Sequence, residues 1–456
     1  MGGDLANASA AWMARAVRER EVSAVELVEA CATRIDARNP EVNAVVVPRL
    51  DEAREEAKAA DEALAREEPV GPLQGVPFTA KEVIPVAGLP CTNGSLLRAG
   101  RVATEDAEVI RRLRGAGSIL LGKTNLAELS AFWDSVNLVY GATRNPHDSS
   151  RSAGGSSGGE AAAVAAAMSP LGIGSDLSGS IRAPAAWTGV FGLRPSRDAV
   201  PFVLHDPLPA SAGVQAFGTA GPLVRTVADL ELALDVMANP RTPAVAVARV
   251  AVFEEDGLQL VSGACREAVR KAAAVLRDAG IELVEEAPPN PAELRAAFDT
   301  ILGFEFAVAL GPVFGDESIE VMPYIEEQRE TARSRTPTLE GYIAAWERVA
   351  EVDAAASAWL ERNPVALCPV VPDVAPPVGV FEFPPVDGEP PRRGGTFTLC
   401  SYASALGLPA LAVPAGRAEG GLPVGVQLFA RRGEDRTLTA LARVLEEALG
   451  GWPDPG

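Results

Sequence analysis

Residues 151–184 read RSAGGSSGGEAAAVAAAMSPLGIGSDLSGSIRAP. The stretch holds two clusters of small residues, 154–159 and 176–180, with an alanine-rich segment between them. Glycine permits positive φ angles and close approach of another group, and consecutive backbone N–H groups in such turns can hold an anion or a developing oxyanion. We predict a helix over 160–168 and a strand over 171–174. The clusters therefore lie between structured elements, which argues against a flexible linker.

The composition of the whole chain is that of a large globular protein. It has 456 residues, of which 47% are hydrophobic and 22% charged, and its net charge is −20. Binding to a phosphate backbone needs clustered Lys and Arg, so this balance argues against a nucleic-acid partner. No apolar run reaches the ~18 residues of a membrane span, and the N-terminus lacks a signal-peptide pattern. The sequence therefore predicts a soluble cytoplasmic protein without a membrane anchor.

Cysteine and histidine usage limits the chemistry. The five cysteines are scattered and form no CxxC pair, which argues against a disulfide framework or a metal site and indicates a reducing compartment. The chain has only two histidines, His147 and His205. A histidine-based catalytic triad would have to use one of them.

Helices and strands alternate along the chain, which is typical of an α/β protein. We predict N-terminal helices over 5–20, 23–38 and 49–67, the second opened by a capping box from Ser23 to Glu26. The next predicted element is a strand over 75–83 that carries Lys81 near its end.

Further along, we expect a helix over 105–114 capped by Thr104 and a helix that begins at Asn125 in capping-box fashion with Glu128. We expect loops over 130–153 and 196–222, because these segments lack periodicity or are rich in proline.

One interpretation of the first small-residue cluster is a nucleophile elbow. Residues 154–158 satisfy G-x-S-x-G, the elbow pattern of α/β-hydrolases. An elbow needs a strand directly before the serine, whereas 146–153 is predicted to be a loop. The fold also needs a histidine later in the chain, and only His205 follows, in a proline-rich loop. These two mismatches make the elbow the weaker alternative.

A second interpretation uses no histidine. Ser180 would be the nucleophile, Ser156 a relay and Lys81 the base, since a Ser–Lys pair can replace Ser-His-Asp. The lysine must be neutral, and burial lowers the pKa of a lysine. A hydroxyl both donates and accepts, so a serine can pass a proton between the other two groups. The oxyanion hole would be formed by the backbone N–H groups of Leu177, Ser178, Gly179 and Ser180.

Four motifs together resemble the amidase signature family: GVPFTAKE at 75–82, GKTN at 122–125, GGSSGG at 154–159 and DLSGSIRAP at 176–184. Each motif alone is weak, and the combination is highly specific. The resemblance is strong over about residues 70–240 and weaker in the N-terminal helices and in LPVGVQL at 422–428. It implies a large mixed β-sheet flanked by helices on both faces, and amide hydrolysis without metal or cofactor.

The resemblance assigns roles to individual residues. The family's catalytic lysine falls on Lys81, its bridging serine, which follows a cis peptide bond, on Ser156, and its acylated serine on Ser180. Positions that support the loop fall on Ser157, Asp176 and Arg182.

Two local features bear on the pocket that the resemblance implies. Ser178 stands where the family usually has glycine, and a serine forced to positive φ there would reshape the oxyanion turn. The segment 133–143 is similar to the fatty-acid amide hydrolase branch, which places the loop 130–133, including Ser130, beside the acyl pocket. The alternative for Trp133 is ordinary core packing. The membrane-anchoring helix of some relatives has no counterpart here.

We interpret residues 1–456 as a single amidase-type domain. It comprises an N-terminal helical layer over 1–68, a catalytic core over 70–240, and a C-terminal part over 245–456 that completes the sheet and the pocket.

The sequence thus predicts an amidase that cleaves a small-molecule carboxylic amide to an acid and an amine or ammonia through an acyl-enzyme on Ser180. One alternative is the glutaminase subunit of a tRNA-dependent amidotransferase, which would need a partner subunit. Another is a weak or inactive amidase-fold binding protein whose Gly/Ser turns hold an anion. The substrate, acyl transfer to an amine in place of water, and the oligomeric state, a homodimer included, stay open.

Overall fold

One large sheet organises the chain. The computed structural model describes residues 4–202, 211–239, 242–309, 318–334, 338–392 and 396–455. In these residues an 11-stranded sheet has the spatial order β1 (Val45–Pro48), β3 (Ile119–Thr124), β2 (Pro77–Lys81), β8 (Leu171–Asp176), β10 (Thr219–Val224), β9 (Phe191–Arg194), β14 (Ala410–Arg417), β15 (Pro423–Ala430), β13 (Val365–Pro369), β11 (Arg249–Val252) and β12 (Glu282–Glu285). β2 and β11 run parallel to both of their neighbours, and the other pairs are antiparallel. The predicted α/β class with a mixed sheet is confirmed.

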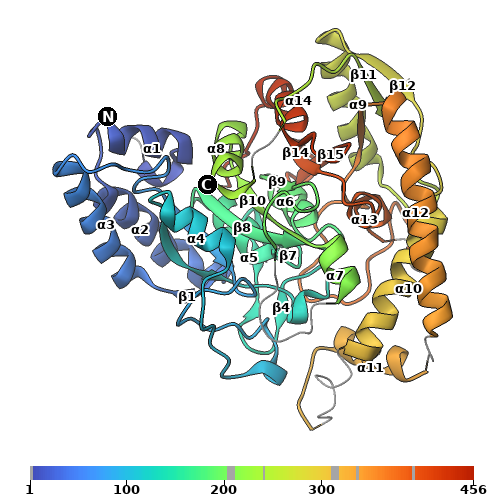
Figure 1. Ribbon diagram of the computed structural model, residues 1–456, viewed down its shortest axis with the longest axis horizontal. Helices are drawn as coiled ribbons and strands as arrows, with labels where there is room; N and C mark the ends of the chain where they lie inside the picture. The colour runs from blue at the N-terminus through green and yellow to red at the C-terminus, as the bar shows by residue number, and fades with distance from the viewer. Residues whose placement is uncertain are drawn as a thin grey trace.

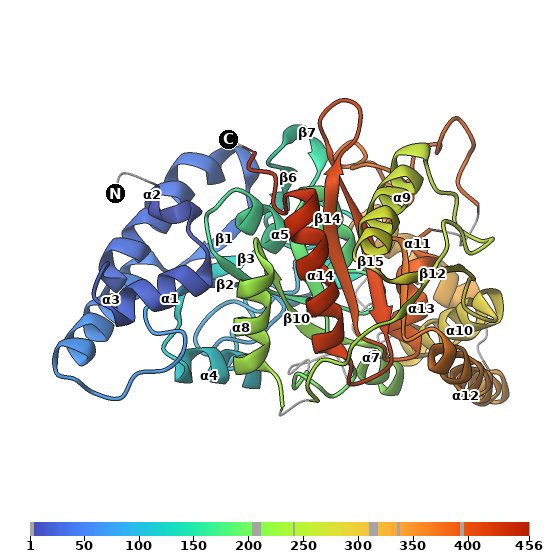
Figure 2. The ribbon, with the colours of Figure 1, turned by 90° about the horizontal axis from the view of Figure 1, so that it is seen from above.

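Helices cover both faces of this sheet. Successive residues of a central strand face opposite cores: Leu411 and Val413 of β14 belong to one hydrophobic cluster, and Ala410 and Ala412 to the other. The first cluster is covered by α1 (Ala10–Arg18), α4 (Glu108–Gly115), α8 (Val227–Met237), α9 (Gly263–Asp278) and α14 (Asp435–Leu449), of which α8, α14 and α9 lie side by side in Figure 2. The second is covered by α5 (Gly158–Ala165), α6 (Arg182–Thr188), α10 (Pro291–Ala309), α12 (Leu339–Arg362) and α13 (Thr398–Ala405).

The N-terminal part of the chain is mainly helical, but it also supplies the edge strand β1 of the main sheet, which was not predicted. α1, α2 (Ala24–Val42) and α3 (Leu50–Ala65) gather at one end of the molecule, opposite α10 and α12 (Figure 1). The capping box is confirmed, because the Ser23 hydroxyl accepts from the backbone of Glu26 and the Glu26 carboxylate accepts from the backbone of Ser23. The helix predicted over 5–20 is interrupted, since a 3₁₀ turn ends at Asn7 and the Ser9 side chain caps α1 separately.

Two predicted helix starts are wrong. α4 begins at Glu108, behind an Ala107 that provides no side-chain cap, and not at Thr104. The helix predicted from Asn125 is a single 3₁₀ turn, Glu128–Ser130, with positive φ at its last two residues. The Glu128 carboxylate accepts from the Ser95 hydroxyl and the Met322 backbone, so it does not complete the expected capping box.

Two predicted loops contain strands. Residues 148–152 form β7 (Asp148–Ser152), which pairs with β6 (Arg144–Asn145) in a small ribbon outside the main sheet, next to the two-stranded ribbon of β4 (Val136–Asn137) and β5 (Gly141–Ala142). The segment 196–222 contributes α7 (Ala212–Phe217) and central strand β10, while 203–210 lies outside the described residues. Proline cannot donate a hydrogen bond to a neighbouring strand, so Pro222 is unusual in a central strand. β10 pairs with β9 only at Leu223 and Val224, so this pairing does not include the proline.

Two further helices, α11 (Pro323–Ser334) and α13, were not predicted from the sequence. Over the described ranges, no helix has the length and apolar character needed to span a membrane.

Candidate active site

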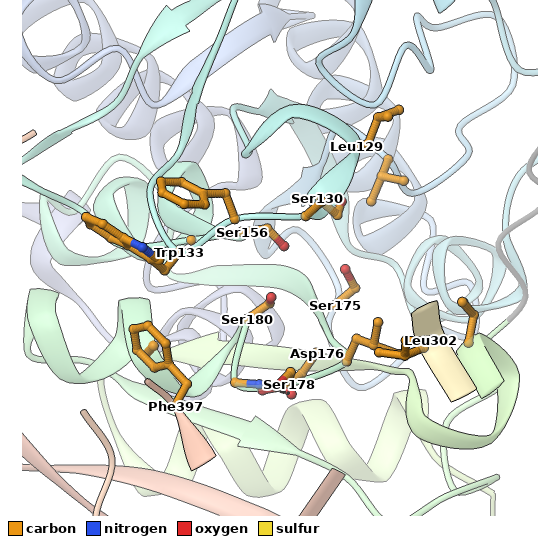
Figure 3. A pocket seen from close by; sticks show the side chains of 18 of the residues that line it. Leu129, Ser130, Trp133, Ser156, Ser175, Asp176, Ser178, Ser180, Leu302 and Phe397 are labelled. Atoms are coloured by element: carbon orange, nitrogen blue, oxygen red, sulfur yellow. Dashed lines mark hydrogen bonds between the residues drawn. The ribbon is translucent and has the colours of Figure 1, made fainter. Parts of the chain in front are cut away.

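Two parallel strands carry the candidate site to one edge of the sheet. β2 and β8 are parallel neighbours with Thr79 opposite Gly172, so both end at the same edge of the sheet, β2 at Lys81 and β8 two residues farther on, at Asp176. The turn before α5 brings Ser156 to the same edge, and the turn before α6 brings Ser180. Figure 3 shows Ser156, Ser175 and Ser180 around one cavity. The structure thus brings together all three residues of the histidine-free interpretation.

Lys81 is completely buried and lies against two serine hydroxyls. Its Nζ is 2.6 Å from Ser156 Oγ and 3.0 Å from Ser175 Oγ. Burial lowers the pKa of Lys81 to about 7, against a smaller opposing effect of the Asp176 and Glu160 carboxyls. A substantial fraction of this lysine is therefore neutral near neutral pH.

The first small-residue cluster, residues 154–159, forms a tight turn with no room for a side chain at Gly154 or Gly155. The peptide bond between Gly155 and Ser156 is cis. A Cβ on Gly155 would lie 2.8 Å from the backbone nitrogen of Asp134, and one on Gly154, at φ 87°, would lie 2.6 Å from Pro184. The turn thus packs against both the 130–135 loop and α6, which fixes the position of Ser156.

Ser157 connects the two serine-bearing turns. Its backbone N–H donates to the carbonyl of Ser180 at 3.1 Å, and its hydroxyl lies 3.2 Å from the carbonyl and 3.3 Å from the nitrogen of Ser175. Its side chain faces the backbone of β8 and is fully buried. Ser157 thus joins the turn at Ser156 to the turn at Ser180 and to β8.

Asp176 and Arg182 stabilise the second turn, residues 176–180. The Asp176 carboxylate accepts from the backbone N–H groups of Gly179 (2.7 Å) and Ile181 (3.1 Å) and from the Arg182 guanidinium at 2.9 and 3.0 Å. Burial alone would raise the pKa of Asp176, but the positive charge of Arg182 holds it well below its usual range. Arg182 also donates to the Cys400 carbonyl and to Gln427, so the turn is anchored to the C-terminal part of the chain.

The N–H groups of the second turn are not equivalent. Gly179 donates to Asp176, so its N–H is engaged and unavailable for an oxyanion in this conformation. Over the described residues, no protein acceptor takes the N–H groups of Leu177, Ser178 or Ser180. Of the four predicted oxyanion donors, these three N–H groups are therefore available to bind an oxyanion.

Ser178 occupies an ordinary backbone position. The residue with positive φ in this turn is Gly179, at 106°, and not Ser178. A Cβ on Gly179 would lie 2.8 Å from the Cβ of Cys400, so glycine is required there both by the positive φ and by the lack of space. Ser178 replaces the usual glycine without backbone strain, and its side chain lines the cavity.

The cavity has a volume of about 290 Å³ and a mainly apolar wall. Ser130 lines it at φ 57° and donates to Asn93 Oδ1 at 2.9 Å. Trp133 lines it too, and its ring also packs edge-on against Trp187 at 6.1 Å, so it borders the cavity and contributes to the packing behind it. Other residues around the cavity are Val83, Leu129, Phe132, Val214, Leu302, Phe306 and Phe397, with Arg295 and Gln328 as polar members.

The sequence analysis missed three residues near the site. Ser175 and Glu160 flank Lys81 in space, and Asp134 links the 130–135 loop to Ser152 and to the backbone of Gly379 at 2.7 Å. Ser175 lies between the strand predicted over 171–174 and the DLSGS motif, and this position was the signal available for it.

The described residues do not meet the strand requirement of the elbow alternative. β7 does precede Ser156, but it belongs to a separate ribbon and not to the main sheet. His147 lies 3.0 Å from the Thr188 carbonyl and does not line the cavity, and His205 lies outside the described residues. The described part of the chain contains no group of three or more His, Cys, Asp or Glu residues placed to hold a metal.

Known proteins share both the sequence pattern and this architecture. A family model described as Amidase matches residues 26–439. AmiB2 of Mycobacterium tuberculosis is 35% identical, over 98% of this chain and 97% of its own length. Human fatty-acid amide hydrolase 2 is 31% identical, over 97% of this chain and 89% of its own. The crystal structure of a bacterial aryl acylamidase of the amidase signature family superimposes with a TM-score of 0.86 at 28% identity, covering 97% of this chain and 96% of the other.

Proposed function

The chain belongs to the amidase signature family and hydrolyses amides, and from this premise we propose that it does so through an acyl-enzyme on Ser180. The observation that carries the proposal is the contact of 2.6 Å between Lys81 Nζ and Ser156 Oγ, fully buried beneath the cavity that Ser180 enters. A neutral lysine in that position accepts the Ser156 proton, while Ser156 accepts the proton of Ser180.

In the proposed acylation step, Ser180 replaces the amine on the acyl group. Ser180 Oγ forms a bond to the amide carbon, and the carbonyl oxygen becomes an oxyanion held by the N–H groups of Leu177, Ser178 and Ser180. The C–N bond breaks when Lys81 returns its proton through Ser156 to the leaving nitrogen. Water cleaves the ester by the same relay in reverse, which releases the acid and restores Ser180.

The cavity wall supports an amide with an apolar acyl or aryl group. Aromatic and aliphatic side chains make up most of this wall, and burying them against an apolar group is favourable. One relative is named for fatty-acid amides and one structural neighbour for aryl acylamides. The one arginine among the described lining residues, Arg295, is paired with Asp299 at 2.8 Å, which disfavours capture of a glutamine carboxylate.

We propose that the partner of the enzyme is this small-molecule substrate, and that the enzyme works in the cytoplasm. The location is inferred from the five cysteines, all free and buried. A homodimer stays a prediction.

Covalent labelling tests the proposed function directly. The chain is treated with a small fluorophosphonate, which phosphonylates activated serines, and the modified residue is found by intact mass and peptide mapping. We expect label on Ser180, and its loss in Lys81→Ala. Label on Ser156 instead would contradict the relay and favour the elbow. A folded, unlabelled chain that carboxylate or phosphate stabilises against heat would favour the binding-protein alternative.

A further inference from the structure

A buried carboxyl, that of Asp134, lies against the turn that carries Ser156. It is 1% exposed and is not among the described residues that line the cavity. Its Oδ1 accepts from the Ser152 hydroxyl, and its Oδ2 accepts from the Gly379 N–H at 2.7 Å. No lysine, arginine or histidine of the described residues forms an ion pair with it. A buried carboxylate without a cation is costly, and the proposed mechanism gives it no role.

The Ser152 hydroxyl connects this carboxylate to the catalytic turn. Ser152 ends β7 and is fully buried. Its Oγ accepts from the Gly154 N–H at 2.9 Å, while its proton is donated to Asp134. A serine hydroxyl has one proton, so the carboxylate determines the direction in which this hydroxyl points. The hydroxyl in turn binds the backbone of Gly154, two residues before Ser156.

The next residue of the loop, Ser135, binds the same turn at two more places. Its N–H donates to the Gly154 carbonyl at 3.1 Å, and its Oγ accepts from the Gly158 N–H at 2.9 Å. Both backbone polar groups of Gly154 are therefore bonded, one to Ser152 and one to Ser135. A Cβ on Gly158 would lie 2.6 Å from Ser135 Oγ, so the loop and the turn are in close contact. Ser156 lies between these two bonded glycines.

The second oxygen of Asp134 joins the loop to the C-terminal part of the chain. Gly379, which donates to it, follows a segment that runs along β7, since the Ser152 N–H donates to the Pro376 carbonyl at 2.8 Å. One carboxylate thus links three segments: the loop 130–135, the strand that leads into the catalytic turn, and residues 376–379. This arrangement holds Asp134 itself in place.

We propose that Asp134 and Ser152 are positioning residues for amide hydrolysis. The carboxylate orients the hydroxyl, and the hydroxyl holds the turn so that Ser156 stays within hydrogen-bonding distance of Lys81. This inference rests on the proposed function, because it requires Ser156 to pass a proton from Ser180 to Lys81. Relay atoms must be placed closely, since a misplacement of about 1 Å can lower a rate about 10²-fold.

A hydrogen bond that only supports the fold would affect stability and leave the chemical step unchanged. Ser169 provides a matched control for this role. It is fully buried like Ser152, and its hydroxyl donates to the Leu171 carbonyl at 2.7 Å, in the connection that leads into β8. Ser169→Ala therefore removes a buried serine hydrogen bond at a place away from the catalytic turn.

The test measures kcat and KM for hydrolysis of an apolar anilide, and the unfolding temperature, in the full chain. The variants are Ser152→Ala, Asp134→Asn, the two combined, and Ser169→Ala. Ser152→Ala removes the acceptor of the Gly154 N–H, and Asp134→Asn keeps the volume but offers one accepting oxygen to two donors. Burial raises the pKa of Asp134 to about 6, so an assay at pH 8 keeps the carboxylate ionised.

We expect Ser152→Ala to lower kcat about 10- to 100-fold and to change KM less than threefold, because the relay and not substrate binding is disturbed. Asp134→Asn should lower kcat in the same way, and it keeps the proposal testable if Ser152→Ala does not fold. The combined variant should be no more than about twofold slower than Ser152→Ala, because both changes act through one link. Ser169→Ala should lower the unfolding temperature and keep the wild-type kcat.

The outcomes separate this inference from the proposed function. A kcat of Ser152→Ala within threefold of the wild type, an equal loss of kcat in Ser169→Ala, or losses that multiply in the combined variant would overturn the role of the pair. If the fluorophosphonate still labels Ser180 in the wild type, the acyl-enzyme mechanism stands in each of these cases. A wild type that is not labelled on Ser180 would overturn the proposed function, and this inference with it.

Discussion

Lys81 contacts two serine hydroxyls, and the proposed mechanism predicts very different consequences for their removal. Ser156 passes the proton, whereas Ser175 only accepts a hydrogen bond from the lysine, at 3.0 Å. Positioned proton transfer contributes roughly 10²–10⁴-fold in enzymes. We therefore expect Ser156→Ala to lower kcat by about that factor.

Ser175→Ala should cost much less. An intramolecular hydrogen bond is worth about 0.5–1.5 kcal/mol, which is about tenfold at most. The remaining contact of 2.6 Å between Lys81 and Ser156 keeps the relay in place. Both serines are buried, Ser156 at 1% and Ser175 at 7% exposure, so a difference between the variants does not reflect a difference in solvent access.

The assay is hydrolysis of an apolar anilide at a pH on the alkaline plateau, with kcat and KM measured separately. The unfolding temperature of each variant establishes that it is folded. Equal losses in the two variants would refute the distinction between relay and support. A Ser156→Ala enzyme that keeps more than a tenth of the wild-type kcat would refute the relay itself.

Three further results are expected. Hydrolysis of the same anilide should rise from acid to neutral pH with an acid limb near 7, because burial lowers the pKa of Lys81 to about 7 and only the neutral amine is a base; a flat profile from pH 5 to 9 would contradict this. Gly179→Ala should abolish labelling, because a Cβ at φ 106° would lie 2.8 Å from Cys400 and displace the oxyanion turn; wild-type labelling rates would show that the turn tolerates it. Asp176→Asn should destabilise the fold by about 3–5 kcal/mol in urea unfolding, since it leaves the buried Arg182 charge unpaired; a loss below 1 kcal/mol would contradict that account.

Much of the site could be predicted from short motifs, because each is a strand end or a turn whose local geometry the sequence dictates. The strand with Lys81 at its end and the glycines around Ser156 and Ser180 are of this kind. The spacing along the chain does not reveal that β2 and β8 are parallel neighbours. That fact brings Lys81 and Ser175 together.

The errors have a common physical origin in tertiary contacts. Glu128 has the spacing of a capping residue, but its carboxylate accepts hydrogen bonds from the Ser95 hydroxyl and from the backbone N–H of Met322, which lies 194 residues farther along the chain. The segment 196–222 was predicted to be a proline-rich loop, yet its last residues begin β10, which lies between β8 and β9. Glu160 looked like an ordinary residue in the first turn of a helix, because its partners Thr79 and Thr124 come from distant strands.

The environments of two buried carboxyls explain how a lysine can be a base in this site. Asp176 lies close enough to favour a protonated Lys81, and an unpaired charge there would oppose the proposed chemistry. Arg182 binds that carboxylate at 2.9 Å, so its negative charge is largely balanced. No arginine of the described residues forms an ion pair with Glu160; burial raises its pKa, and its charge is correspondingly reduced at neutral pH. A salt bridge in one case and burial in the other thus reduce the effect of each carboxyl in raising the pKa of Lys81. Burial of the lysine itself then lowers that pKa.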